Sequence, residues 1–139
     1  MKVKQIDKTL EQLEGEVWED INYPTNLVKT IYLLRKKILK DFSVEDLRIV
    51  IGQSFSLPYL IPLAIEKLNQ NILAEGDYFE GDLLKSVLDS DKSFWVANKK
   101  YWQIVKELYV KNEKILQLDD SYKQLKKSFE QFVMIHDNS

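Results

Sequence analysis

The sequence contains no cysteine, only one histidine and no long run of apolar residues. The absence of cysteine excludes disulfides, thiolate catalysis and the common structural zinc sites, and it fits a reducing cytoplasm. The first residues, MKVKQIDKTLEQLEGE, lack the apolar core of a signal peptide. No stretch approaches the ~20 apolar residues of a transmembrane helix. The protein is therefore expected to be soluble and cytoplasmic, with no membrane partner.

The single histidine, His136, lies near the C-terminus and gives a catalytic triad no base. Its spacing after Phe129, Phe132 and Val133 places it near the apolar face of the last expected helix, which favours packing or a helix-end role. The segment GQSFS (residues 52–56) lacks the second glycine of a nucleophile elbow. The sequence thus argues against a hydrolase with a histidine base.

Proline and glycine are also scarce, with three and four residues respectively, and strand signals are few. Apolar residues instead recur at helical spacing. Gly15 can end a short first helix, Thr25 can cap the second, and Ser43 with Asp46 resembles a capping box for the third. Local signals therefore mark the helix ends in the N-terminal third.

Further helices are expected from Leu57-Pro58, at residues 82–88, and as an antiparallel pair over residues 101–116 and 118–136. Asp119 or Asp120 can cap the last of these. The prediction is one domain, residues 1–139, folded as an all-α bundle of about six or seven helices.

Negative charge is concentrated in two segments, although the net charge is only −2. Residues 7–20 and residues 74–91 each carry six carboxylates against one lysine, whereas the chain from residue 92 onwards carries more lysine than acid. A nearly balanced total argues against a generic nucleic-acid binder, which would be strongly basic. The lysines mixed with aromatics at residues 99–102 and 123–127 favour a solvated helix face over a phosphate track.

The segment LAEGDYFEGDLL, residues 73–84, is the most unusual part of the chain, and three interpretations compete for it. A calcium loop would need alternating ligands over twelve residues and a closing glutamate, which are missing. Asp77 and Asp82 could act as a catalytic acid and base, but acid catalysis needs a desolvated carboxyl with a raised pKa. An acidic surface for a basic protein is the third interpretation.

A structural role accounts for part of this segment. Asp82 can cap the following helix, Gly76 and Gly81 permit tight turns, and Tyr78 and Phe79 can anchor the loop on the core. That role leaves the remaining carboxylates, which lie beside the two aromatics, for a binding surface. The candidate contact residues are Glu75, Asp77, Tyr78, Phe79 and Glu80, with a secondary acidic patch at Glu14, Glu16, Glu19 and Asp20.

Four short motifs occur in order along the first two thirds of the chain: TLEQLE (residues 9–14), LRIVIGQ (47–53), LPYLIPLA (57–64) and EGDYFEGDLL (75–84), followed by SFW (93–95). In these motifs the chain resembles the immunity proteins of contact-dependent growth inhibition (CDI) systems over roughly residues 8–90. It departs from the family pattern at Ile72 and Glu80, where proline is typical, and in the order of Tyr78 and Phe79. These departures make the loop more acidic and less rigid.

The resemblance implies a small cytoplasmic protein, not an enzyme, that binds and neutralises the C-terminal toxin domain of a CDI effector without a cofactor or metal. Such toxins are often nucleases, so the carboxylates of residues 75–82 could occupy a surface that otherwise holds phosphates. Two alternatives stay open: a helical adaptor for another basic protein, and a small hydrolase using Asp77 and Asp82. The toxin's activity and the oligomeric state do not follow from the sequence.

Overall fold

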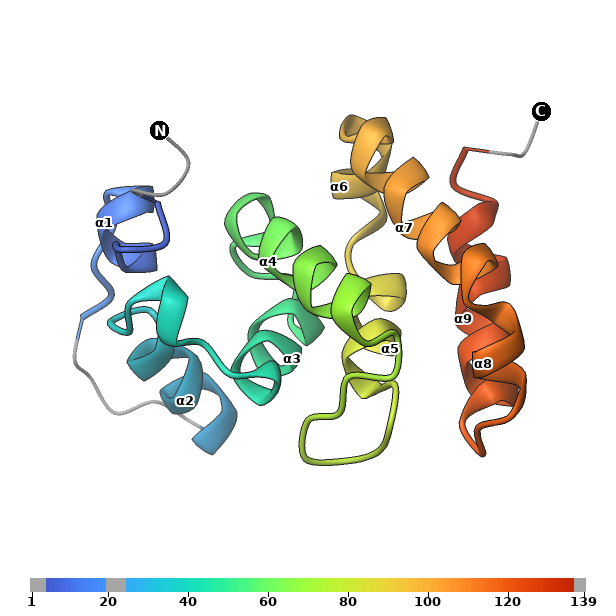
Figure 1. The fold of residues 1–139 in the computed structure, drawn as a ribbon. Helices are drawn as coiled ribbons and strands as arrows, with labels where there is room; N and C mark the ends of the chain where they lie inside the picture. Colours follow the sequence, from blue (N-terminus) through green and yellow to red (C-terminus); the bar gives the residue numbers. More distant parts are fainter. Residues whose placement is uncertain (1–4, 20–24, 137–139) are drawn as a thin grey trace.

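A computed structural model describes residues 5–19 and 25–136 of the chain (Figure 1). These residues form nine α-helices and one 3-10 helix, with no strand among them. The elements are α1 (Leu10–Glu14), α2 (Asn26–Leu34), η2 (Leu39–Asp41), α3 (Val44–Gly52), α4 (Leu57–Gln70), α5 (Asp82–Asp89), α6 (Lys92–Ala97), α7 (Lys99–Lys111), α8 (Glu113–Gln117) and α9 (Tyr122–Val133).

The predicted all-α bundle is confirmed, but it is built from more and shorter helices than expected. Asn112 interrupts the helix predicted over residues 101–116, and its side-chain amide donates to the Leu108 carbonyl at 2.8 Å. The sequence pattern does not predict α6, because six residues are too few to show a helical period. None of the described helices has the length and apolar character needed to cross a membrane.

Local capping signals in the first half of the chain are confirmed. The Thr25 hydroxyl accepts from the Val28 amide, and Ser43 and Asp46 form a complete capping box. Gly15 ends α1 with a φ of 66°, in the left-handed region that glycine favours. Residues near the helix ends thus fix where each of the first three α-helices begins or stops.

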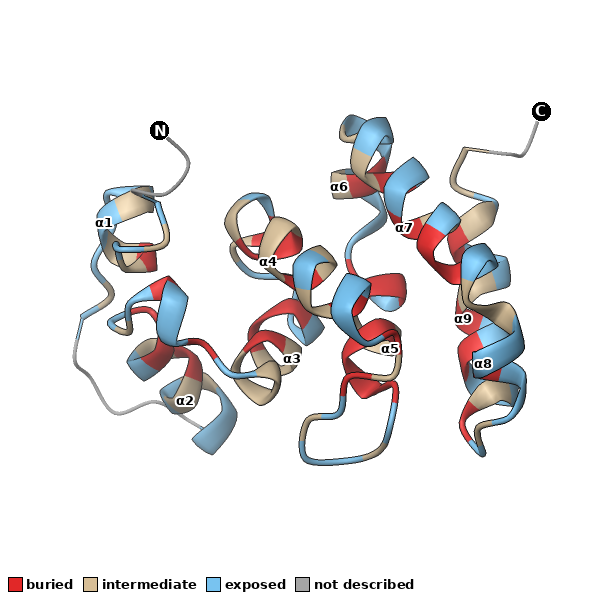
Figure 2. Ribbon diagram, in the orientation of Figure 1, coloured by how far each residue is buried: buried red, intermediate tan, exposed pale blue. Residues whose placement is uncertain are grey.

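The core is organised around α5, which packs against α3, α4 and α9. The chain runs from α1 and α2 on one side of the bundle to α7, α8 and α9 on the other, so α5 lies in the middle (Figure 1). Leu83, Leu84 and Val87 of α5 are fully buried, as are Leu60 and Ile61 of α4. In Figure 2 these helices carry buried residues where they face their neighbours. The start of α5 is therefore fixed in position by the core.

The N-terminal arm is held to the body by a buried arginine. Arg35 is only 3% exposed, and its guanidinium pairs with the Glu14 carboxylate and donates to the Glu16 carbonyl at 2.8 Å. The guanidinium carbon also lies 4.9 Å from the centre of the Trp18 ring, which makes an edge contact with Phe55. Removing the Glu14 carboxylate would leave the buried cation with only the exposed Glu16 carboxylate, 4.0 Å away, as a counter-ion.

His136 takes a packing role at the C-terminal end. Its Nε2 lies 2.8 Å from the Trp95 carbonyl, and its ring makes an edge contact with Trp102 at 4.8 Å between centroids. Both tryptophans are buried, and their indole N–H groups donate to Ser90 Oγ and to the Phe132 carbonyl, each at 2.9 Å. The preference for packing over catalysis agrees with these contacts.

Glu14→Gln should lower the free energy of unfolding by about 2–3 kcal/mol, because Arg35 stays buried and loses its ion pair. Glu16→Gln is the matched control: this carboxylate is 70% exposed and lies 4.0 Å from the same guanidinium, so its loss should cost less than about 0.5 kcal/mol. Urea unfolding of the two variants measures the difference. Equal stability in both would contradict a structural role for the buried pair.

Candidate functional site

The segment of residues 71–81 forms a loop that links α4 to α5 and projects from one end of the bundle (Figure 1). Glu75 and Glu80 face each other in an isolated antiparallel bridge, which makes the loop a narrow hairpin with residues 76–79 at its tip. Below the bridge, the Gly81 amide donates to the Leu73 carbonyl at 3.2 Å. We refer to residues 71–81 as the acidic loop.

The carboxylate of Asp82 holds the tip of the acidic loop from below. It accepts hydrogen bonds from the backbone amides of Gly76 at 2.7 Å, Tyr78 at 3.0 Å and Phe79 at 3.3 Å. Asp82 is only 3% exposed. Three amides that would otherwise lack a protein partner thus share one buried acceptor, which fixes the path of the tip.

The prediction that Asp82 caps the following helix is wrong. The capping position belongs to Gly81, with a φ of 93°, and Asp82 is the first residue of α5. At this position its side chain reaches back to the preceding loop and makes no capping bond to the helix. The physical reason is that the loop tip offers three amides, whereas the glycine conformation turns the chain into α5 without a side-chain cap.

Two residues of α3 hold the loop from the side. Glu45 Oε1 accepts from the Asp77 amide at 2.8 Å and from Arg48 Nε at 2.6 Å. These hydrogen bonds, chiefly those from Arg48, lower the pKa of Glu45 below its usual value and favour its charged form. The Arg48 guanidinium also lies 3.9 Å from the Asp82 carboxylate, so α3 and the start of α5 are joined beneath the loop.

The two glycines of the loop are needed for different reasons. A side chain at Gly76 would collide with the Glu45 carboxylate and come within 3.2 Å of the Asp82 carboxylate. At Gly81 the positive φ disfavours other residues, and a Cβ would lie 2.9 Å from a methyl group of Leu125. The predicted turn role is confirmed at Gly81, whereas Gly76 is required by close approach.

The two aromatic residues at the tip differ in their surroundings. Phe79 is half-buried, but Tyr78 is 73% exposed, and its ring centre lies 4.3 Å from the guanidinium carbon of Arg48. The prediction that both rings anchor the loop on the core is wrong for Tyr78. Its ring is positioned by a cation–π contact and leaves most of its surface to solvent.

The acidic loop exposes the side chains of Glu75, Asp77 and Glu80. Two further carboxylates from the α8–α9 connection lie beside them. Asp119 and Asp120 line a shallow pocket together with Phe79 and Glu80. A side-chain hydrogen bond to Asp119 and the negative charge of Asp119 raise the pKa of Glu80, whereas hydrogen bonds from Ser121 lower the pKa of Asp119. We call Glu75, Asp77, Glu80, Asp119 and Asp120 the acidic cluster.

Sequence reasoning missed Asp119 and Asp120 as members of this surface, because it assigned them to a helix cap. In the structure Ser121 occupies the capping position of α9, and the Asp119 carboxylate accepts from the Ser121 amide at 2.9 Å. The available signal was the short connection before the last helix, which carries two adjacent carboxylates. Only the packing of α9 against α5 brings that connection to the acidic loop.

The second acidic segment of the sequence has different surroundings. Glu14 is committed to Arg35, Glu11 pairs with Lys36 at 2.8 Å, and Glu19 also has an interaction partner. Asp20, the last member of the predicted secondary patch, lies outside the described residues. Glu14, Glu16 and Glu19 do not join the acidic loop, because α1 and residues 15–19 lie away from it at one side of the bundle (Figure 1).

No salt bridge within residues 5–19 and 25–136 joins a carboxylate of the acidic cluster to a cation. The cluster therefore carries negative charge that the described part of the protein leaves uncompensated. The same part of the chain holds no group of three histidine, aspartate or glutamate side chains arranged to bind a metal ion. Asp82 is buried and engaged by three amides, so the structure offers no accessible acid–base pair of Asp77 with Asp82.

Comparison with known proteins identifies the family. A family model described as CDI immunity proteins matches residues 12–105, which include the acidic loop and the residues of α3 and α5 that hold it. No curated protein and no solved structure shows significant similarity to the chain. The match covers more than half of the sequence and agrees with the resemblance in the sequence motifs. The chain belongs to the family of CDI immunity proteins.

Proposed function

We propose that the protein binds the toxin domain of its cognate CDI effector through the acidic loop and keeps that toxin inactive. The observation that carries this proposal is the acidic cluster: five carboxylates that pair with no cation among the described residues. Three of them lie on a loop that hydrogen bonds to Asp82 and Glu45 hold in place. A toxin domain that acts on nucleic acid presents a basic surface to its substrate phosphates. The acidic cluster complements such a surface in charge.

Preorganisation supports this role. The tip hydrogen bonds to Asp82 and Glu45 are made within the free protein, so the loop does not have to be ordered when a partner binds. A binding surface that is already ordered loses less conformational entropy on association. Less of the free energy of interaction is therefore spent on ordering the loop, and more of it contributes to affinity.

The chemistry of the loop also fits a protein partner. Tyr78 presents an exposed aromatic ring on the same loop as the exposed carboxylates, and aromatic residues are enriched among those that dominate binding energy at interfaces. The Arg48 guanidinium beneath the ring holds it in place. Tyr78 would supply apolar contact area, and the surrounding carboxylates would supply long-range attraction and specificity.

Reversing the exposed charges tests the assignment. A variant with Glu75→Lys, Asp77→Lys and Glu80→Lys should associate with the cognate toxin domain about tenfold or more slowly at low ionic strength. Its rate should also depend less on salt than that of the wild type. Binding kinetics at two salt concentrations measure both effects. In cells that express the toxin domain, the wild type should restore growth and the variant should restore less.

A second triple variant provides the control for this charge reversal. It carries Asp41→Lys, Glu66→Lys and Glu130→Lys at three exposed carboxylates outside the acidic cluster. These substitutions change the net charge by the same amount as the charge reversal in the loop. This variant should keep nearly wild-type association rates. Equal losses in both variants, or no loss in either, would exclude the acidic loop as the contact surface. Failure of the wild type to restore growth would refute the proposed function itself.

The substitution Asp82→Asn tests preorganisation. It should lower the free energy of unfolding by about 2 kcal/mol, because the tip amides lose a charged acceptor. Hydrogen exchange should accelerate at the amides of Gly76, Tyr78 and Phe79, and toxin affinity should fall although Asp82 itself is buried. The control is Asp89→Asn at the other end of α5, which removes an exposed pair with Lys85 and should cost ~0.3–0.5 kcal/mol. Unchanged loop exchange in Asp82→Asn would contradict this role.

The substitution Glu80→Gln should separate stability from binding. Because neighbouring carboxylates raise the pKa of Glu80, its charged form is disfavoured in the folded state, and the destabilising repulsion appears as pH rises through that pKa. Removing the charge should therefore leave thermal stability at pH 7 unchanged or higher, while toxin affinity falls. Melting curves and affinities at pH 5 and pH 7 test this. A clear loss of stability at pH 7 would contradict it.

A further inference from the structure

A basic groove lies along the exposed side of α7. It is lined by Lys99, Lys106 and Lys111, together with Trp102, Gln103, Glu107 and Val110. The lysine at position 106 lies over the Trp102 ring, with Nζ 5.1 Å from the ring centre, and Val110 is 55% exposed. We call these seven residues the α7 groove. Its three lysines outnumber its one carboxylate, and Val110 adds exposed apolar surface.

The α7 groove complements the acidic loop in both charge and polarity. The loop presents uncompensated carboxylates together with the exposed ring of Tyr78, and the groove presents lysines beside the exposed aliphatic side chain of Val110. No salt bridge joins Lys99 or Lys111 to a carboxylate in the part of the chain that the structure describes. Each surface therefore offers charges that the other could neutralise.

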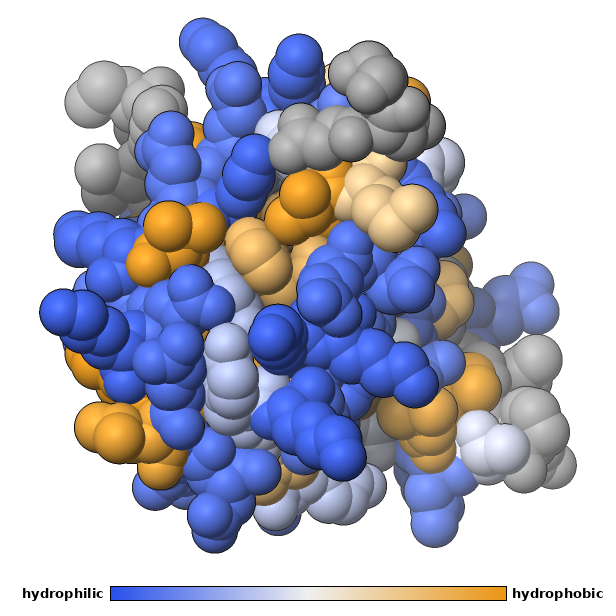
Figure 3. Space-filling view, turned by 90° about the vertical axis from the view of Figure 1, so that its right-hand side faces the viewer, coloured by the Kyte–Doolittle hydropathy of each residue, from blue (hydrophilic) through white to orange (hydrophobic). Residues whose placement is uncertain are grey.

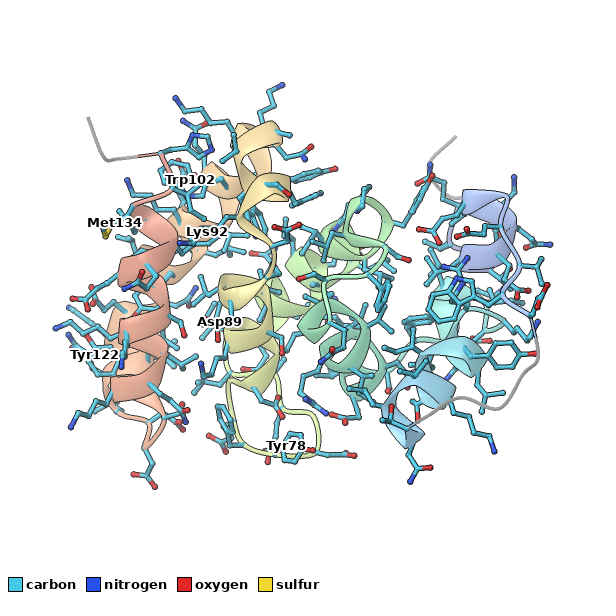
Figure 4. The ribbon with its side chains drawn as sticks, turned by 180° about the vertical axis from the view of Figure 1, so that it is seen from behind. Tyr78, Asp89, Lys92, Trp102, Tyr122 and Met134 are labelled. Atoms are coloured by element: carbon cyan, nitrogen blue, oxygen red, sulfur yellow. The ribbon has the colours of Figure 1, made fainter. Side chains whose placement is uncertain are left out.

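The two surfaces lie too far apart to meet within one molecule. In Figure 4 the labelled Trp102 lies at one end of the bundle, and the labelled Tyr78 lies on the loop at the opposite end. Figure 3, which shows the side that carries the C-terminal helices, displays a largely hydrophilic face with hydrophobic residues set between the hydrophilic ones. Contact between loop and groove thus requires a second molecule.

We propose that the acidic loop of one molecule docks in the α7 groove of a second copy. The contact joins two different surfaces, so the groove of the first molecule and the loop of the second stay open, and further copies can add in the same way. The attraction relies on exposed charges, which makes it sensitive to salt. The protein therefore forms short head-to-tail assemblies at high concentration and low ionic strength.

This self-association would compete with toxin binding, because both use the acidic loop. A toxin domain that occupies the loop would prevent it from entering a groove and would release monomers. The inference rests on the geometry of the loop and the groove and requires no toxin for its test. Failure of toxin binding and failure of self-association are therefore separate results.

Sedimentation velocity tests the proposal on the full chain. The wild type should sediment faster as its concentration rises in a buffer of about 20 mM salt, and as a monomer in about 500 mM salt, where the screening length falls to a few ångströms. A variant with Lys123→Glu and Lys127→Glu, two exposed lysines of α9 outside the groove, should behave like the wild type at low salt. A wild type that stays monomeric at every concentration in low salt would overturn the proposal.

Two neutralised variants identify the surfaces involved. The loop variant carries Glu75→Gln, Asp77→Asn and Glu80→Gln, and the groove variant carries Lys99→Gln and Lys111→Gln. Each alone should be monomeric, because it lacks one side of the contact. Mixed together they should form a 1:1 complex and nothing larger, since only the intact loop of one variant can enter the intact groove of the other. Wild-type assembly by either variant alone, or no complex in the mixture, would refute head-to-tail docking; circular dichroism verifies that each variant is folded.

Discussion

The candidate site depends on one buried carboxylate. Asp82 accepts from three amides of the loop tip, and its own position is fixed because α5 packs against α3, α4 and α9. If water replaced Asp82 as the acceptor for these amides, the loop would be free to sample many conformations. Burying the acceptor beneath the tip ties the conformation of a surface loop to the hydrophobic core. The exposed carboxylates then take their arrangement from the packing of helices.

Paired and unpaired carboxylates distinguish the two acidic segments, which are equal in net charge. In the N-terminal segment, Glu14 compensates the buried Arg35, and Glu11 pairs with Lys36. These charges stabilise the attachment of the arm. In the acidic cluster the charged neighbours of Glu80 are the carboxylates of Asp119, Glu75 and Asp120, and no salt bridge among the described residues compensates them. A count of charges along the sequence therefore identifies two equivalent patches, whereas their partners assign one mainly to folding and leave the other uncompensated, as the proposed binding role requires.

The sequence predicts features that depend on neighbours along the chain and fails where contacts join distant segments. Thr25, Ser43 and Gly15 act within one helical turn, so their roles follow from local patterns. Asp82 fits an N-cap pattern equally well, but its carboxylate binds the preceding loop because the tip offers three amides. Asp119 and Asp120 join the loop only through the packing of α9 on α5. The exposure of Tyr78 depends on Arg48 in α3, thirty positions earlier in the sequence.

Crowding of carboxylates also limits how much charge such a surface can carry. The raised pKa of Glu80 shows that its neighbours already oppose its ionisation. Another carboxylate at the same spacing would raise the pKa of Glu80 further, and protonation of Glu80 would offset part of the added negative charge. The arrangement is stable because the cluster is exposed to water, while the cation Arg48 and the acceptor Asp82 lie below it. The proposed basic partner would relieve the repulsion that the free protein sustains, and this relief would contribute to the free energy of binding. Affinity gained in this way is specific for cationic surfaces, because a neutral surface would bury the same carboxylates without compensating them.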